Sequence, residues 1–117
     1  MEARLICFGE VELDGRRYEH DVVIAGGVVH RRRKGPSKSL RGQNGHTPLS
    51  VREAIPWGGR RLIVGTGVDG QLPIAAAVFE EAAGRDIEIV ALPTEEACRL
   101  LGPVETAKVR AILHISC

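Results

Sequence analysis

The chain has 117 residues, nearly balanced charges and few aromatic side chains. A chain of this length fits one domain over residues 1–117 and buries roughly two-thirds of its unfolded surface. Aromatic residues make up only 3% of the sequence, so the core must consist of Val, Ile, Leu and Ala. The 16 Lys and Arg residues against 15 Asp and Glu give a net charge of +1, which creates no long-range field toward a particular partner.

The sequence shows neither a secretory signal peptide nor a membrane-spanning segment. The apolar stretch near the amino terminus is too short for a signal peptide, and no run approaches the ~20 apolar residues of a membrane helix. The cysteines Cys7, Cys98 and Cys117 are widely separated and form no metal-ligand spacing with the histidines. We therefore expect a cytoplasmic protein with free buried thiols, no metal site and no cofactor. For Cys98 we favour core packing over activation at the start of a helix.

The first third of the chain predicts antiparallel hairpins. Residues 10–14 alternate apolar and acidic side chains, which is the period of a half-buried strand. Asp14-Gly15 is a strong tight-turn signal, because such a turn needs positive φ and Gly adopts it at little cost. Gly26-Gly27 gives a second turn, between residues 21–24 and residues 28–30, which are mostly apolar.

The rest of the chain alternates predicted helices and strands. In chain order we expect a short helix from Thr47-Pro48 to Pro56, a strand over 61–64, a helix from Pro73 to Gly84, a strand over 87–92, a helix over 94–101 and a strand over 108–115. Strands separated by single helices favour parallel neighbours. The sequence therefore predicts an α/β fold, in which helices pack against a mixed β-sheet that is preceded by an N-terminal antiparallel hairpin region.

A basic run opens a long loop rich in Gly, Pro, Ser and Asn. Its members are Arg31, Arg32, Arg33 and Lys34. We favour a solvated basic loop, with an acidic protein partner as the alternative. Nucleic acid is a minor option, because the chain lacks aromatic stacking platforms and recognised nucleic-acid-binding motifs.

The strand end at Gly65, Thr66 and Gly67 is the best candidate for a ligand site. Ligands bind at the carboxyl ends of strands in open α/β sheets, and glycines let backbone amides converge on an anion. The segment is neither a dinucleotide fingerprint nor a P-loop. The competing interpretation, which we favour, is that these glycines only permit a sharp turn.

Four other side chains are placed near this strand end. Asp69 and Thr94 follow predicted strands and could face one cleft, Asp69 as a base and Thr94 as a polar anchor. A turn residue and a helix cap are the simpler roles, and we favour them. His46 and His114 complete the candidate set, although a lone histidine is more often a hydrogen-bonded structural group than a general base.

Several of these motifs occur together in a known family. They are the Val11–Gly15 hairpin, Gly65-Thr66-Gly67, the Pro93-Thr94-x-x-Ala97 helix start and the Leu113-His114-x-x-Cys117 ending. In this order they resemble the small-domain family that contains mitochondrial complex I assembly factor three and the cytosolic adipogenesis-associated protein, with many bacterial and archaeal members. The resemblance implies a mixed α/β sheet with a projecting hairpin region and no agreed enzymatic activity. Relatives often carry an aromatic-Asn pair where this chain has Leu100-Leu101-Gly102.

These observations predict a small soluble protein that acts as a non-enzymatic binding or assembly module. The reason is that no complete catalytic constellation, such as a GxSxG nucleophile elbow, is present. The alternative is a small-molecule or anion-binding protein, with or without catalysis, whose site lies at Gly65 to Gly67. A homodimer is compatible with either function.

Overall fold

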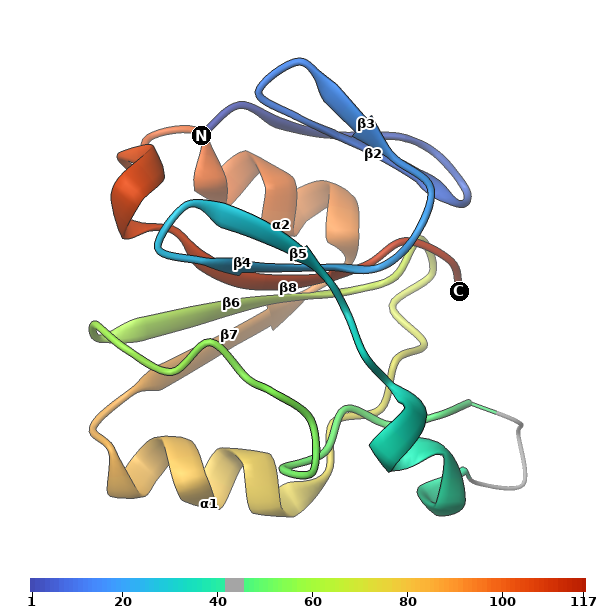
Figure 1. The fold of residues 1–117 in the computed structure, drawn as a ribbon, viewed down its shortest axis with the longest axis vertical. Coiled ribbons are helices and arrows are strands. Elements are labelled where there is room, and N and C mark those ends of the chain that lie inside the picture. Colours follow the sequence, from blue (N-terminus) through green and yellow to red (C-terminus); the bar gives the residue numbers. More distant parts are fainter. Residues whose placement is uncertain (42–45) are drawn as a thin grey trace.

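The computed structural model describes residues 1–41 and 46–117, and its strands form two sheets (Figure 1). The smaller sheet is antiparallel, in the order β1-β2-β3, with β1 (Ala3–Cys7), β2 (Glu10–Leu13) and β3 (Arg16–Tyr18). The larger sheet has the order β5-β4-β8-β6-β7, with β4 (Val22–Ala25), β5 (Val28–Arg31), β6 (Arg61–Thr66), β7 (Glu88–Leu92) and β8 (Arg110–His114).

Tight turns build the antiparallel part of the fold, which confirms the prediction from the two glycine signals. Asp14 and Gly15 have φ values of 47° and 85° and connect β2 to β3. Gly26 and Gly27 have φ values of 59° and 82° and connect β4 to β5. Positive φ at both central residues matches the right-handed twist of the flanking strands, so each turn fixes the register of its hairpin.

The second half of the chain forms the parallel part of the larger sheet. Strand β6 pairs in parallel with β7 and with β8, while β8 pairs antiparallel with β4 and so joins the two halves. Helix α1 (Ala76–Gly84) connects β6 to β7, and α2 (Thr94–Leu101) connects β7 to β8. The predicted mixed α/β sheet is confirmed. Strand β8 begins later than expected, because Thr106–Lys108 forms the short 3-10 helix η2.

Helix α2 lies between the two sheets, and α1 covers the opposite face of the larger sheet (Figure 1). Successive residues of a strand point to opposite faces, so β8 contributes to both apolar layers. Ala111 and Leu113 lie in the layer with α2 and the smaller sheet, whereas Ile112 lies in the layer with α1. Val109 and Ile115 join the first layer, as the predicted alternation requires.

The predicted helix between Thr47 and Pro56 is wrong. The backbone of Leu49 pairs instead with the segment before α1, because its N–H donates to Pro73 and its carbonyl oxygen accepts from Ala75. This pairing uses backbone groups that a helix would need for itself. Helix α1 accordingly begins at Ala76 and not at Pro73. Within the basic loop, Gly35–Leu40 forms the 3-10 helix η1.

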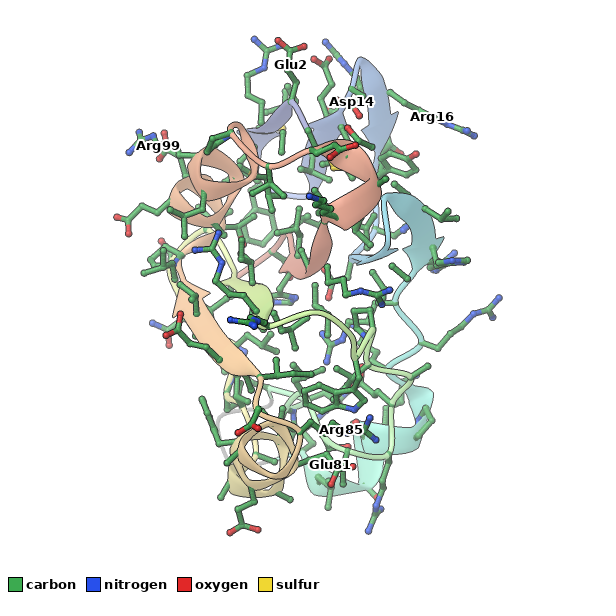
Figure 2. All side chains as sticks on the ribbon, turned by 90° about the vertical axis from the view of Figure 1, so that its left-hand side faces the viewer. Glu2, Asp14, Arg16, Glu81, Arg85 and Arg99 are labelled. Carbon is green, nitrogen blue, oxygen red and sulfur yellow. The ribbon has the colours of Figure 1, made fainter. Side chains whose placement is uncertain are left out.

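Exposed ion pairs lie on the surface at both ends of the molecule (Figure 2). At one end, Arg85 of α1 forms an ion pair with Glu81 at 3.0 Å and lies over the ring of Trp57. At the other, Arg99 pairs with Glu95 at 3.3 Å. Such exposed pairs typically contribute up to about 1 kcal/mol each. Among the described residues, no helix is long and apolar enough to cross a membrane.

Candidate functional site

The backbone amides of the turn after β6 are hydrogen-bonded within the protein. The N–H of Gly67 donates to Oγ1 of Thr94 at 2.9 Å, and the N–H of Val68 donates to the carbonyl oxygen of Ser116 at 2.7 Å. The next amide, of Asp69, donates to an oxygen of Cys117 at 3.2 Å. This arrangement fits the interpretation that we favoured from the sequence, in which the glycines permit a sharp turn, because Thr94 and the carboxyl-terminal segment already accept hydrogen bonds from these amides.

The glycines of this turn are required by close approach of the chain. Gly67 has a φ of 108°, and a side chain there would collide with the backbone of Cys117. A Cβ at Gly65 would lie 2.8 Å from Oγ1 of Thr94. Thr94 is fully buried, and its hydroxyl donates to the carbonyl oxygen of His114, so Thr94 ties β6 to the end of β8. Thr66 is also buried.

The predicted site residues separate into two groups in the structure. Asp69 is exposed on its turn, and its side chain does not line the pocket described below. His46 and His114 do line that pocket, together with Cys117. The two histidines therefore lie beside one cavity, whereas the glycine turn near which they were predicted does not line it.

A network of buried charged groups lies close to the end of β8. Its centre is Arg32, which follows β5 and whose side chain is 2% exposed. The guanidinium donates Nε to Oε1 of Glu53 at 2.8 Å and Nη2 to Oε2 at 3.1 Å. Its Nη1 donates to Oδ2 of Asp21 at 2.9 Å. Burial lowers the pKa of Arg32, but the hydrogen bonds and charges of Glu53 and Asp21 outweigh burial, so this pKa is raised.

Two serines extend the network into the loop segments. Oγ of Ser37 donates to Oε2 of Glu53 at 2.6 Å and lies 2.6 Å from Oγ of Ser50. Since the single proton of Ser37 goes to the carboxylate, Ser50 must donate to Ser37. Every buried side-chain nitrogen and oxygen among the described residues has a partner. The network thus fastens η1 and the segment around Ser50 to the larger sheet.

Asp21 links this network to His114. Its Oδ2 accepts from Nδ1 of His114 at 2.7 Å, and its Oδ1 accepts from the N–H of Ile115 at 2.9 Å. Burial raises the pKa of Asp21, but the hydrogen bond and charge of His114, the N–H of Ile115 and the charge of Arg32 together hold it at about 2. On the far side of the ring, Nε2 of His114 lies 3.2 Å from Oγ of Ser116.

A cavity of about 170 Å³ lies beside His114 and Ser116. Its lining is mainly basic and polar, and consists of Arg32, Lys34, Arg41, His46, Thr47, Leu72, His114, Ser116 and Cys117. None of these described lining residues is Asp or Glu. Among residues 1–41 and 46–117, no three His, Cys, Asp or Glu side chains come together as a metal-ligand set.

The basic run does not behave as one solvated segment. Arg31, Arg33 and Lys34 are exposed, as expected for a solvated loop. For Arg32 the prediction of a solvated side chain is wrong, because this side chain is buried and pairs with the carboxylates of Asp21 and Glu53. It is therefore unavailable as a surface contact for a partner, and its role is to hold the loop.

The thiol of Cys98 belongs to the core and is not activated. Cys98 is buried among the apolar residues that contact α2. Burial and the neighbouring charge of Glu95 raise the pKa of this thiol to about 11. Cys7 is exposed and Cys117 half-buried, so the expectation of buried thiols holds for Cys98 alone.

Sequence reasoning missed five members of this region: Asp21, Ser37, Ser50, Glu53 and Ser116. For Asp21 and Ser37 the sequence offers no local signal, because their side-chain partners lie 11 or more residues away. Ser50 and Glu53 are local partners of each other, because the N–H of Ser50 donates to Oε2 of Glu53 at 3.4 Å, and their Ser-x-x-Glu spacing is that of a capping box. Ser116 could have been found. It lies two residues after His114, and strand periodicity places side chains at that spacing on the same face.

Solved structures that are similar to this chain cover nearly all of it. No protein-family model and no curated protein matches the chain significantly. The solved structure named MT938 is 26% identical over 95% of both chains, with a TM-score of 0.69. The conserved hypothetical protein PH1505 from Pyrococcus horikoshii OT3 is 31% identical over 100% of both chains, with a TM-score of 0.81. The chain therefore belongs to the same family as PH1505, a family of small α/β proteins represented here by conserved hypothetical members.

Proposed function

We propose that this protein binds a small anionic ligand in the cavity beside His114. The observation that carries the proposal is the charge character of the side chains that line the cavity. They include five basic residues and, among the described residues, no Asp or Glu. Arg32 is largely neutralised by Asp21 and Glu53. The exposed side chains of Lys34 and Arg41 at the same cavity supply the charge that would attract an anion.

The size of the cavity limits the ligand. Pockets for drug-sized molecules measure roughly 300–1,000 Å³, so a cavity of about 170 Å³ suits a compact anion. Guanidinium and ammonium groups hydrogen-bond carboxylates and phosphates, and Thr47 offers a hydroxyl group for a remaining oxygen. We therefore assign a short carboxylate or a phosphate as the ligand class.

The buried network supports this role by fixing the walls of the cavity. Arg32 and His114 belong to both the network and the lining. Their side chains are held by several hydrogen bonds before any ligand arrives, so little side-chain entropy remains to be lost on binding. A preformed cationic cavity is the arrangement that a binding protein needs.

Thermal denaturation tests the proposal with two probes, succinate and inorganic phosphate, at constant ionic strength. A probe at 100 times its Kd stabilises the native state by about 2.7 kcal/mol, which raises Tm by several degrees. We expect a rise for at least one probe in the wild-type protein and a much smaller rise in the Lys34→Gln/Arg41→Gln variant.

A second cationic cavity provides the matched control. It measures about 420 Å³ at the opposite end of β6 and β8, and its lining includes Arg60, Arg61 and Arg110. The Arg60→Gln/Arg61→Gln variant should retain the full rise in Tm. No rise with either probe, or an equal rise in the Lys34→Gln/Arg41→Gln variant, would contradict the proposal.

A protein-binding role for β5 is the second candidate. Strand β5 is an edge of the larger sheet, with Val28 58% exposed and Arg31 and Arg33 exposed beside it. An edge strand offers backbone groups to an added strand, and the cations favour an acidic segment of a partner protein. The resemblance to a family that includes an assembly factor favours the same role. A crosslinked pull-down should recover a stoichiometric partner with the wild-type protein and lose it with Arg31→Glu/Arg33→Glu. Recovery of no such partner would exclude this role.

A further inference from the structure

We propose that Ser116, His114 and Asp21 form a hydrolytic triad that cleaves a short ester bearing an anionic group in the cavity. The proposal rests on the proposed function, since the cationic cavity is what would hold the anionic group. Its own evidence is a continuous hydrogen-bond chain. Oγ of Ser116 lies 3.2 Å from Nε2 of His114, and Nδ1 of His114 lies 2.7 Å from Oδ2 of Asp21.

The chain of contacts has the order that a nucleophile, a base and an orienting carboxylate require. Strand alternation carries His114 and Ser116 onto one face at the end of β8. Antiparallel pairing of Val22 with Leu113 then brings Asp21, at the start of β4, beside His114. Three side chains from two distant parts of the sequence are thus aligned by the sheet itself.

The protonation pattern follows from the acceptors. Asp21 also accepts from Arg32, so it stays ionised and can only accept a hydrogen bond from His114. In the neutral imidazole, the proton must therefore reside on Nδ1, which leaves the lone pair of Nε2 directed to Ser116. This is the tautomer in which His114 can remove the hydroxyl proton of Ser116.

The reaction balances with water as the only co-reactant. Oγ of Ser116 bonds to the ester carbonyl carbon while its proton passes to Nε2 of His114. The alcohol then leaves with that proton, and Ser116 carries the acyl group. A water molecule, deprotonated by the same Nε2, attacks the acyl carbon, and the carboxylic acid leaves as Ser116 recovers its proton. Asp21 stabilises the imidazolium formed in each half, as a positioning residue.

The cavity specifies the acyl part of the substrate. His114 and Ser116 line it together with Lys34 and Arg41. An ester whose acyl group ends in a second carboxylate could therefore place that carboxylate near the two cations and its carbonyl carbon near Ser116. A neutral ester lacks this attraction, so we expect discrimination in favour of the anionic one.

Hydrolysis of 4-nitrophenyl hydrogen succinate tests the inference, with 4-nitrophenyl acetate as the neutral comparison. We expect the wild-type protein to release nitrophenolate from the succinate ester in preference to the acetate. Mass spectrometry of the quenched reaction should locate the succinyl group on Ser116. Ser116→Ala should lower the rate about hundredfold or more, and His114→Gln should do the same.

Matched variants separate the alternatives. Ser116→Ala should keep the Tm rise given by succinate, which shows that its cavity is intact. Cys7→Ser, at an exposed thiol outside the cavity, should keep the hydrolysis rate, and Cys117 should carry no acyl group. An acyl group on Cys117, or full activity in Ser116→Ala, would overturn the triad.

The outcomes also separate this inference from the proposed function. If succinate raises Tm through Lys34 and Arg41 but the ester is hydrolysed no faster than in buffer, the triad is wrong and anion binding stands. If neither effect occurs, both fail.

Discussion

Two regions at the same end of the larger sheet differ in what occupies them. The turn that follows Gly65 was a candidate ligand loop, yet the amides of residues 67–69 donate to Thr94, Ser116 and Cys117. The region around Arg32 has the sequence of a solvated basic loop, yet it contains a buried network that borders a cavity. Glycines show that the backbone must come close to something, but not whether that is a ligand or the chain itself.

The two regions also differ in how they are stabilised. The glycine turn depends on close backbone contact, whereas the network depends on compensation between buried charges. Removing one partner of a buried pair leaves an uncompensated charge, and a side chain added at Gly67 has no space to occupy. Substitutions at the two regions should therefore lower the free energy of unfolding for different reasons.

Arg32→Met should lower the free energy of unfolding most, by about 3–5 kcal/mol. The substitution leaves the carboxylates of Asp21 and Glu53 buried without their cation. Urea denaturation measures the change. Arg33→Met, at the exposed neighbouring position, should change the free energy of unfolding by no more than about 0.5 kcal/mol. Equal effects at the two positions would show that Arg32 is not buried in the folded protein.

Gly67→Ala should cost about 3 kcal/mol, because strain at a φ of 108° adds to a collision with the backbone of Cys117. Gly9→Ala is the matched control. Gly9 has a similar φ of 88° but open space around its Cβ position, so only the backbone strain of about 1 kcal/mol remains. A Gly67→Ala protein as stable as Gly9→Ala would mean that the carboxyl-terminal segment does not occupy the turn.

Acid should weaken the network through Asp21. The pKa of this group is about 2 in the folded protein against an ordinary 3.8, so the folded state binds fewer protons than the unfolded state between these values. The resulting stabilisation, on the order of 2 kcal/mol, is complete above about pH 5 and is lost as pH falls toward 2. Urea denaturation between pH 2 and 6 should show this loss, and Asp21→Asn should flatten that part of the profile. An unchanged profile in Asp21→Asn would assign the acid sensitivity to other carboxylates.

Arg99→Ala should have the smallest effect, about 0.3–0.5 kcal/mol. It removes the pair with Glu95 on α2, in which both side chains are about 70% exposed. Arg99→Ala and Arg32→Met each remove an arginine that pairs with a carboxylate, but only the pairs of Arg32 are buried. If Arg99→Ala lowers the free energy of unfolding by more than about 1 kcal/mol in urea denaturation, burial is not what makes the Arg32 substitution costly.

Local patterns were sufficient to predict most of the fold. Asp14-Gly15 and Gly26-Gly27 fixed two hairpins, and the period of residues 109–115 placed one face of β8 in the core. The segment at Thr47 to Pro56 was predicted wrongly, since its backbone partners at Pro73 and Ala75 lie far along the chain.

The candidate site was predicted only in part. His46 and His114 could be named as polar residues of interest, and the structure brings both to one cavity. Their surroundings could not be foreseen, because Asp21 contacts His114 across 93 residues and Glu53 contacts Arg32 across 21. Such contacts follow from sheet topology, and no local pattern of residue types encodes them.

An NMR titration of backbone amides with succinate at constant ionic strength locates the anion site residue by residue. We expect saturable shifts for Lys34, His46 and residues 114–117, which lie at or beside the cavity, and none in the Lys34→Gln/Arg41→Gln variant. Saturable shifts centred on Arg60, Arg61 and Arg110, or no saturable shift at all, would contradict this expectation.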